Sequence, residues 1–77
     1  MKTLVELVQS DKGKSKGNHR VEVVGDERKF YYYTTVICQA NDNNKVFSID
    51  DSYGSKSTKR ACNWYHAYFT AFGYEEV

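Results

Sequence analysis

Every residue from Phe30 to Cys38 favours extended backbone, and this run of aromatic and β-branched side chains restricts the fold more than any other feature of the chain. It predicts one long strand from Lys29 to Ala40. The polar stretch 41–44 is typical of a tight turn, because Asn and Asp tolerate left-handed backbone. The segment from Lys45 to Asp50 is then expected to return as the second strand of a hairpin.

The turn also predicts the register of this hairpin. With Asp42 and Asn43 at the tip, the expected pairs are Ala40 with Lys45, Cys38 with Phe47, and Val36 with Ile49. One face would carry Tyr32, Thr34, Val36, Cys38, Phe47 and Ile49. The other would carry Tyr31, Tyr33, Thr35, Ile37 and Gln39, opposite Val46 and Ser48. A slip of one residue would expose the apolar set, so the register should be strongly specified.

Three further elements are expected around the hairpin. The alternating segment from Arg20 to Val24 predicts a strand, after which 25–28 form a polar turn. The spacing of the leucines and valines in the segment from Thr3 to Ser10 predicts a short helix, with an edge strand as the alternative. A longer helix should start at Ser57 or Thr58. Its apolar stripe is Ala61, Trp64, Tyr65, Tyr68, Phe69 and Phe72.

Together these elements predict a single α+β domain over residues 1–77, with the order α-β-β-β-α. Its first layer is a three-stranded antiparallel meander. The C-terminal helix, which should end at Gly73, covers one face of the meander. The short N-terminal helix packs beside it or at an edge.

Charge and composition narrow the function classes. The 77 residues include 11 Lys and Arg and 10 Asp and Glu, for a net charge of +1. That balance argues against a histone-like binder and against an acidic mimic of nucleic acid. There is no apolar run long enough to cross a membrane and no leader-like start. Two cysteines form no disulfide framework, so we expect a cytoplasmic location, in a bacterial host.

The basic residues gather in one place, between Asp11 and Arg20. Gly, Ser and Asn dominate residues 11–18, which predicts a mobile loop. Lysines on such a loop can contact phosphates, and tyrosines on a neighbouring sheet can stack on bases. The candidate nucleic-acid-binding residues are therefore Lys12, Lys14, Lys16 and Arg20. A solvated loop without a ligand is the simpler interpretation.

Three short patterns resemble parts of functional motifs, but each lacks residues that the complete motif requires. Gly13-Lys14-Ser15 lacks the first glycine of a phosphate-binding loop, because Val8 stands at that position. Cys62 and His66 lie on one helix face but have no neighbouring ligands to complete a zinc site. The strand-end carboxylates of residues 50 and 51 point to opposite sides. We therefore expect no catalytic residue, no metal or cofactor, and no enzymatic activity.

The outer face of the predicted sheet is the strongest candidate for a binding surface. Tyr31, Tyr33 and Ile37 would form an apolar, aromatic patch that a single helix on the other side cannot cover, with Arg60 on its rim. Exposed patches of this kind mark partner sites. The alternative is that the N-terminal helix or a second copy of the chain covers this face, which would make a homodimer.

The segment from Phe30 to Val77 combines the Tyr-rich strand, the Asn/Asp turn, the strand end Ile49-Asp50-Asp51, and the aromatic helix that closes in Phe72-Gly73-Tyr74. In this combination the chain resembles small accessory proteins of bacteriophages and mobile elements. The resemblance implies a viral protein that acts through protein–protein interaction. The expected function is stoichiometric inhibition of a host protein or ribonucleoprotein complex, such as a defence system, in the manner of an anti-CRISPR protein. A small nucleic-acid-binding regulator that uses residues 12–20 is the alternative.

Overall fold

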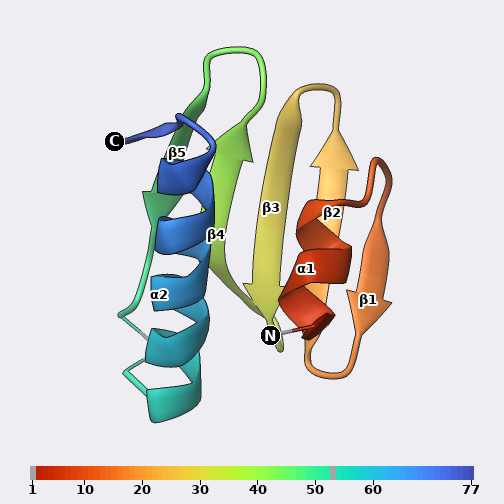
Figure 1. Cartoon of the computed structure of the whole chain (residues 1–77). Coiled ribbons are helices and arrows are strands. Elements are labelled where there is room, and N and C mark those ends of the chain that lie inside the picture. The colour runs from red at the N-terminus through yellow and green to blue at the C-terminus, as the bar shows by residue number, and fades with distance from the viewer. Residues whose placement is uncertain (1, 53) are drawn as a thin grey trace.

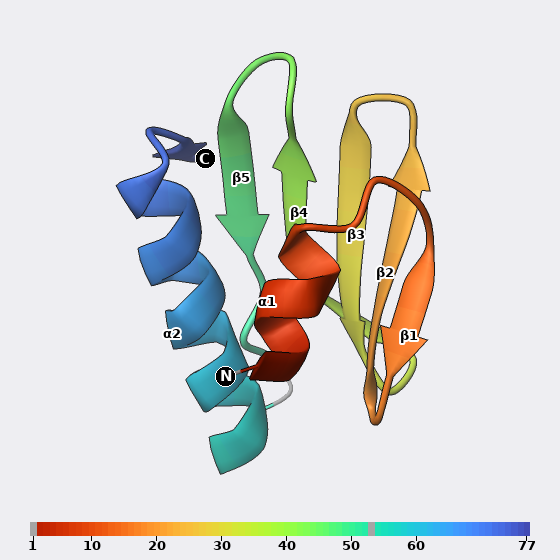
Figure 2. The same ribbon diagram turned by 45° about the vertical axis from the view of Figure 1, so that its right-hand side comes forward.

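The computed structural model describes residues 2–52 and 54–77 and shows an α+β fold in two layers, a sheet and two helices (Figure 1). Both helices lie on the same face of the sheet (Figure 2). The elements are α1 (Lys2–Val8), β1 (Lys14–Lys16), β2 (His19–Val24), β3 (Glu27–Tyr32), β4 (Thr35–Asn41), β5 (Val46–Ile49), α2 (Lys56–Ala71) and β6 (Glu75–Glu76).

The sheet has six strands in the order β1-β2-β3-β4-β5-β6. Neighbouring strands are antiparallel except β5 and β6, which are parallel. The predicted meander of three strands is therefore too small. Two short edge strands extend the sheet, and the predicted strand from Lys29 to Ala40 is two strands, β3 and β4.

The β3–β4 hairpin turns at Tyr33 and Thr34, inside the run that predicted a single strand. Tyr32 pairs with Thr35, and Tyr33 lies in the left-handed region with φ of 55°. The Tyr33 amide donates a hydrogen bond to the Asn18 carbonyl in the preceding turn, with an N···O distance of 2.8 Å. Long-range pairing with β2 thus stabilises a turn that the residue types disfavour.

From Cys38 onward, the β4–β5 hairpin is predicted correctly in its faces and wrongly in its register. The structure pairs Ala40 with Phe47 and Cys38 with Ile49, a shift of two residues from the expected pairs. Residues 42–45 form the turn, with Lys45 at φ of 57°. Because side chains alternate with a period of two, a shift of two leaves Phe47 on the core side. Phe47 is accordingly buried.

A bulge in β4 reverses the predicted faces over part of this strand. Phe30 pairs with Cys38 but Tyr31 pairs with Val36, so Ile37 is an extra residue. Ile37 and Cys38 are both buried, with exposures of 0% and 1%. Val36 shares the outer face with its partner Tyr31, against our expectation, and Ile37 belongs to the core.

The two helices supply most of the remaining core. Leu4, Leu7 and Val8 of α1 are buried, which confirms the short N-terminal helix. Helix α2 is capped two or three residues before expectation, because the Ser55 side chain, and not that of Ser57 or Thr58, accepts a hydrogen bond from the Thr58 amide at 3.1 Å. The backbone after Phe72 turns left-handed at the following glycine, residue 73, as predicted.

Four aromatic rings from three elements join α2 to the sheet. Tyr65 and Phe69 of α2 lie 4.7 and 5.8 Å from the ring of Phe30, and Phe69 stacks on Phe47 at 5.5 Å. All four side chains are almost fully buried.

Within the described residues, no helix is long and apolar enough to cross a membrane.

Candidate functional site

The four residues predicted to form a partner-binding patch do not lie together. Ile37 is buried in the core, and Tyr33 stands at the tip of the β3–β4 hairpin, 56% exposed, with its ring edge-on to Tyr32. Arg60 is exposed on α2, on the helical side of the molecule. Only Tyr31 remains on the outer face of the sheet.

On that face, charged neighbours hold the ring of Tyr31. The Arg20 guanidinium lies 4.0 Å from the ring centroid, and the tyrosine hydroxyl donates a hydrogen bond to Glu22 at 2.7 Å. This hydrogen bond raises the pKa of Tyr31. Besides Val36, the pairing partner of Tyr31, this face carries mainly charged and polar residues, among them Glu27, Lys29, Gln39 and Ser48. The outer face is thus a hydrated, mixed-charge surface and not the apolar patch that we expected.

The basic segment is more ordered than a mobile loop. Lys14, Ser15 and Lys16 form the edge strand β1 against β2. Both lysines bond to Glu6 of α1, Lys14 at 3.6 Å and Lys16 through a short hydrogen bond, and this bond lowers the pKa of Glu6. Arg20 instead lies on the outer face beside Glu22. Lys14 and Lys16 therefore lie on the helical side of the sheet and Arg20 on the other side, whereas Lys12 is exposed in the segment before β1.

A row of aromatic side chains on α2 forms the apolar surface that the sequence did not identify. The ring centroids of Trp64 and Tyr68 are 5.3 Å apart with nearly parallel planes, and Phe72 lies 4.6 Å beyond Tyr68. Trp64 and Tyr68 belong to the apolar stripe that was expected to cover the sheet, but they are only half-buried, and Phe72 is 64% exposed. Ile49, expected in the core, is also only partly buried. We call Trp64, Tyr68 and Phe72 the aromatic strip.

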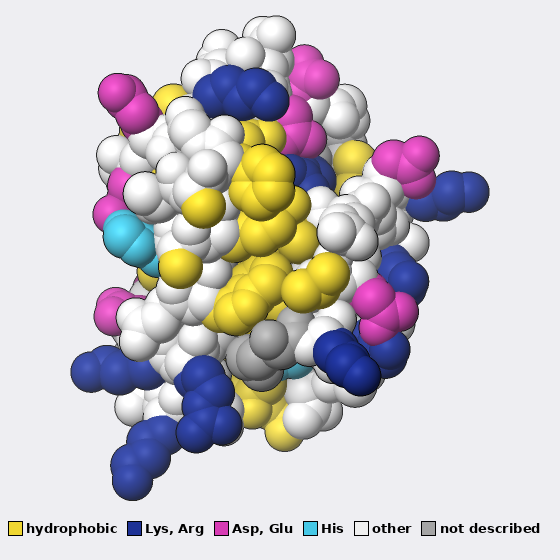
Figure 3. Space-filling view, in the orientation of Figure 1, with side chains coloured by type: hydrophobic (Ala, Val, Ile, Leu, Met, Phe, Trp, Pro, Cys, Tyr) yellow, Lys and Arg dark blue, Asp and Glu magenta, His cyan; other side chains and the backbone are white. Residues whose placement is uncertain are grey.

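The aromatic strip faces α1. On the opposite flank of α2, His66 contacts Phe47 of β5 and Glu76 of β6, so that flank faces the β6 edge of the sheet. The strip must then point to the middle of the sheet. On α1, Glu6 faces β1, and Val5, 36% exposed, lies on the other flank. In Figure 3 apolar side chains follow the band between the two helices.

The strip is open because the helices cover different strands. Helix α1 contacts β1 and β2, whereas α2 contacts β4, β5 and β6. Strands β2 and β5 are three strand spacings apart, about 14 Å. Packed helices approach each other to roughly 8–10 Å. The space above β3 is therefore too wide for the two helices to close.

A recess of about 460 Å³ lies near the C-terminal ends of both helices, between the turns at the ends of β2 and β4. The buried side chain that lines this recess is Arg28. Its guanidinium donates hydrogen bonds to the Val8 carbonyl at 2.5 Å and to the Asp42 carboxylate at 2.8 Å. The hydroxyl of Tyr74 donates to the same Asp42 oxygen, and burial raises the pKa of Tyr74. Because Arg28 satisfies an open carbonyl of α1, its role here is to hold α1 on the sheet.

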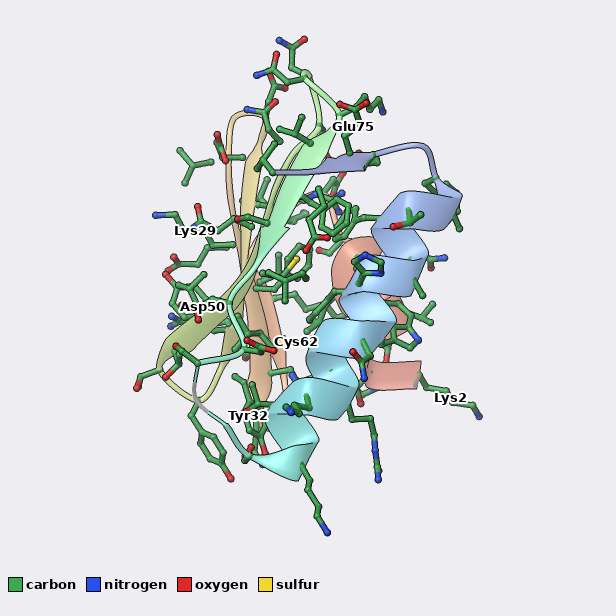
Figure 4. The ribbon with its side chains drawn as sticks, turned by 90° about the vertical axis from the view of Figure 1, so that its left-hand side faces the viewer. Lys2, Lys29, Tyr32, Asp50, Cys62 and Glu75 are labelled. Atoms are coloured by element: carbon green, nitrogen blue, oxygen red, sulfur yellow. The ribbon has the colours of Figure 1, made fainter. Side chains whose placement is uncertain are left out.

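Cys62 and His66 point in different directions. Cys62 is 3% exposed, and its sulfur lies 3.7 Å from the Asp50 carbonyl oxygen, where Figure 4 shows the two residues side by side. Burial raises the pKa of Cys62 to about 11, which disfavours the reactive thiolate. His66 faces Glu76 at 3.3 Å. Among the described residues, no three His, Cys, Asp or Glu side chains are placed to share a metal ion.

No protein-family model matches the chain, and no curated protein or solved structure is significantly similar to it. The resemblance to phage proteins therefore stays a prediction. The candidate site is the aromatic strip. The sequence did contain a signal for it, because Trp64, Tyr68 and Phe72 form a second row beside Ala61, Tyr65 and Phe69. One row packs on the sheet, and a helix at the sheet border leaves the other partly open.

Proposed function

We propose that this chain is a non-enzymatic binding protein that inhibits a host protein or ribonucleoprotein complex by occupying its surface. The observation that carries the proposal is the exposure of the aromatic strip on the helical side. A soluble chain gains stability by burying Trp, Tyr and Phe, so a half-open row of them favours a partner. Aromatic side chains are also enriched in protein–protein interfaces.

The size of the molecule is compatible with this mode of action. The chain exposes 4860 Å² in total, and a standard interface takes about 800 Å² from each partner, roughly one sixth of that surface. One side of the molecule is enough for such an interface. An inhibitor that acts by one-to-one binding needs only this interface.

The alternative function, a nucleic-acid-binding regulator, has less support. Its lysines are partly neutralised, because Lys14 and Lys16 share the carboxylate of Glu6. Arg20 covers one face of Tyr31, the ring that was expected to stack on bases. Phosphate binding needs cations that converge on one surface.

The test compares three tagged proteins in lysate of a bacterial host, with and without nuclease: the wild type, Phe72→Ser and Val24→Ser. Val24 is the matched control, because it is 77% exposed on a strand and lies far from the strip in the sheet order. We expect nuclease-resistant capture of one complex by the wild type and Val24→Ser, and loss with Phe72→Ser. Inhibition of the purified target should be complete at one equivalent. Turnover of the target by substoichiometric amounts, or capture of nucleic acid without a host protein, would contradict the proposal.

A further inference from the structure

We infer that the aromatic strip, together with Lys56 and Arg60, the two cations of α2 that lie in the same helical row, binds an acidic amphipathic helix of the partner protein. This inference rests on the proposed function and names the chemistry that the site recognises. It combines two observations, an open apolar row on α2 and unpaired positive charge at one end of that row.

The positive charge is placed where it destabilises the helix. Lys56, Lys59 and Arg60 all lie in the first two turns of α2, and the first turn holds no acidic residue. The N-terminal end of a helix carries the positive end of its dipole, so cations there are unfavourable. Within residues 2–52 and 54–77, none of the three cations is paired with a carboxylate. An acidic ligand would relieve this repulsion.

The positive charge of Arg60 and the aromatic strip lie in one row along α2. Arg60 stands one turn before Trp64, in the same row of the helix as Tyr68 and Phe72. From Arg60 to Phe72 the row is about 18 Å long, the length of a helix of roughly 12 residues. Lys2, at the start of α1, lies at the same end of the molecule as the first turns of α2 (Figure 4). A matching ligand has an apolar face and carboxylates at one end.

The stacking within the strip favours a helix over single-stranded nucleic acid. Trp64 stacks on one side of the Tyr68 ring, and Phe72 packs against it from the next turn. Bases bind by stacking on free ring faces. One face of the Tyr68 ring is already occupied by Trp64 within the strip, which leaves less free ring face for a base.

The test uses a synthetic peptide and the fluorescence of Trp64, the one tryptophan of the chain. The peptide has about 14 residues, leucines at helical spacing and glutamates elsewhere, and no Trp or Tyr. A second peptide carries lysine in place of each glutamate. We expect the acidic peptide to shift the Trp64 emission with saturation at one equivalent, and the basic peptide to bind at least about tenfold more weakly.

Two matched pairs of variants locate the binding. Arg60→Glu and Lys59→Glu change the net charge equally, but Lys59 lies one residue earlier, on the flank of His66. Arg60→Glu should weaken acidic-peptide binding about tenfold, and Lys59→Glu by less than about threefold. Phe72→Ser should also weaken it about tenfold, and Val24→Ser should not. Circular dichroism verifies that each variant is folded.

Three outcomes would overturn the inference: equal binding of the acidic and basic peptides, equal effects of Arg60→Glu and Lys59→Glu, or displacement of the acidic peptide by an oligothymidylate. Concentration-dependent Trp64 emission without any peptide would assign the strip to a second copy of this chain and would overturn it too. These results are independent of the capture experiment. A partner that is captured through Phe72 while the acidic peptide does not bind would preserve the proposed function and reject the acidic helix.

Discussion

Ile37 and Cys38 are consecutive residues of β4, yet both side chains are buried on the helical side of the sheet. The bulge that produces this arrangement removes Ile37 from the outer face. We therefore expect Ile37→Ala to lower the free energy of unfolding by about 2–5 kcal/mol, the range for truncation of a buried aliphatic side chain. Urea denaturation monitored by Trp64 fluorescence measures the change.

The matched control for this prediction is Gln39→Ala, two residues further along the same strand and exposed. Its effect should stay within about 0.5 kcal/mol. If Ile37→Ala were as mild as Gln39→Ala, Ile37 would lie outside the core and the bulge would be wrong.

The turn residue Tyr33 gives a second prediction. Its φ of 55° is unfavourable for a residue with a Cβ, and its side chain is 56% exposed. Tyr33→Gly should therefore leave the free energy of unfolding unchanged or raise it by up to about 1 kcal/mol. Tyr33→Val should lower it, because a β-branched side chain is strained at this φ. A thermal melt in which glycine is worse than valine would contradict the turn.

The helix α2 and the two hairpins around β4 show which features local periodicity predicts and which it misses. Helix α2 and the faces of β5 were predicted correctly, because their apolar residues repeat with the period of a helix or a strand. The turn at Tyr33 and Thr34 was missed, because neither residue is a typical turn former and a hydrogen bond to Asn18, in the turn between β1 and β2, stabilises it. The register of β4 and β5 differs by two residues, an error that alternation alone cannot detect.

The candidate site, too, was predicted only as far as local sequence patterns determine it. The edge strands β1 and β6 have only three and two residues, so their sequences carry little signal, and β6 pairs with residues about 30 positions earlier in the chain. The aromatic row was visible in the sequence as apolar periodicity. Its exposure depends on the separate positions of α1 and α2 on the sheet, which no local pattern encodes. Sequence therefore supplied the residues of the strip but not its role.

A third prediction concerns Arg28, which links α1, β3 and the β4–β5 turn through Val8 and Asp42. Arg28→Met keeps the aliphatic stem but removes these charge-assisted hydrogen bonds. It should lower the free energy of unfolding by about 1.5–3 kcal/mol. Lys29→Met, the next residue and exposed on the outer face, is the control and should be nearly neutral.

Hydrogen exchange distinguishes this role from general destabilisation. If Arg28 holds α1 on the sheet, amides of α1 should lose protection in Arg28→Met before those of α2 do. A uniform loss of protection over both helices would contradict the capping role.

The fourth prediction is a pH dependence that arises from His19. Burial lowers its pKa below 6.5, and its Nδ1 has no hydrogen-bond partner among the described residues. As the pH falls below 6.5, the unfolded chain binds the proton more readily than the folded one, so stability decreases. Above 6.5 the imidazole is neutral in both states and stability is constant with respect to this group.

His19→Phe keeps a ring against Tyr32 but cannot be protonated. Chemical denaturation between about pH 8 and pH 5.5, above the range of most carboxylates, should show a steeper loss of stability in the wild type than in His19→Phe. Parallel curves for the two proteins would mean that the imidazole of His19 has the same proton affinity in the folded and unfolded chain.

The last prediction tests the absence of thiol chemistry in the proposed function. Both cysteines are buried, burial raises the pKa of both thiols, and that of Cys62 reaches about 11. At pH 8 only about one thousandth of the Cys62 thiol would be ionised, and the thiolate is the reactive form. Native protein should therefore react with Ellman's reagent only as fast as it unfolds, whereas protein in guanidinium should release two equivalents at once. Cys62→Ser and His66→Ala should retain partner binding. Rapid labelling of one thiol in the native state, or loss of activity in a folded Cys62→Ser variant, would assign chemistry to the cysteine and contradict inhibition by binding alone.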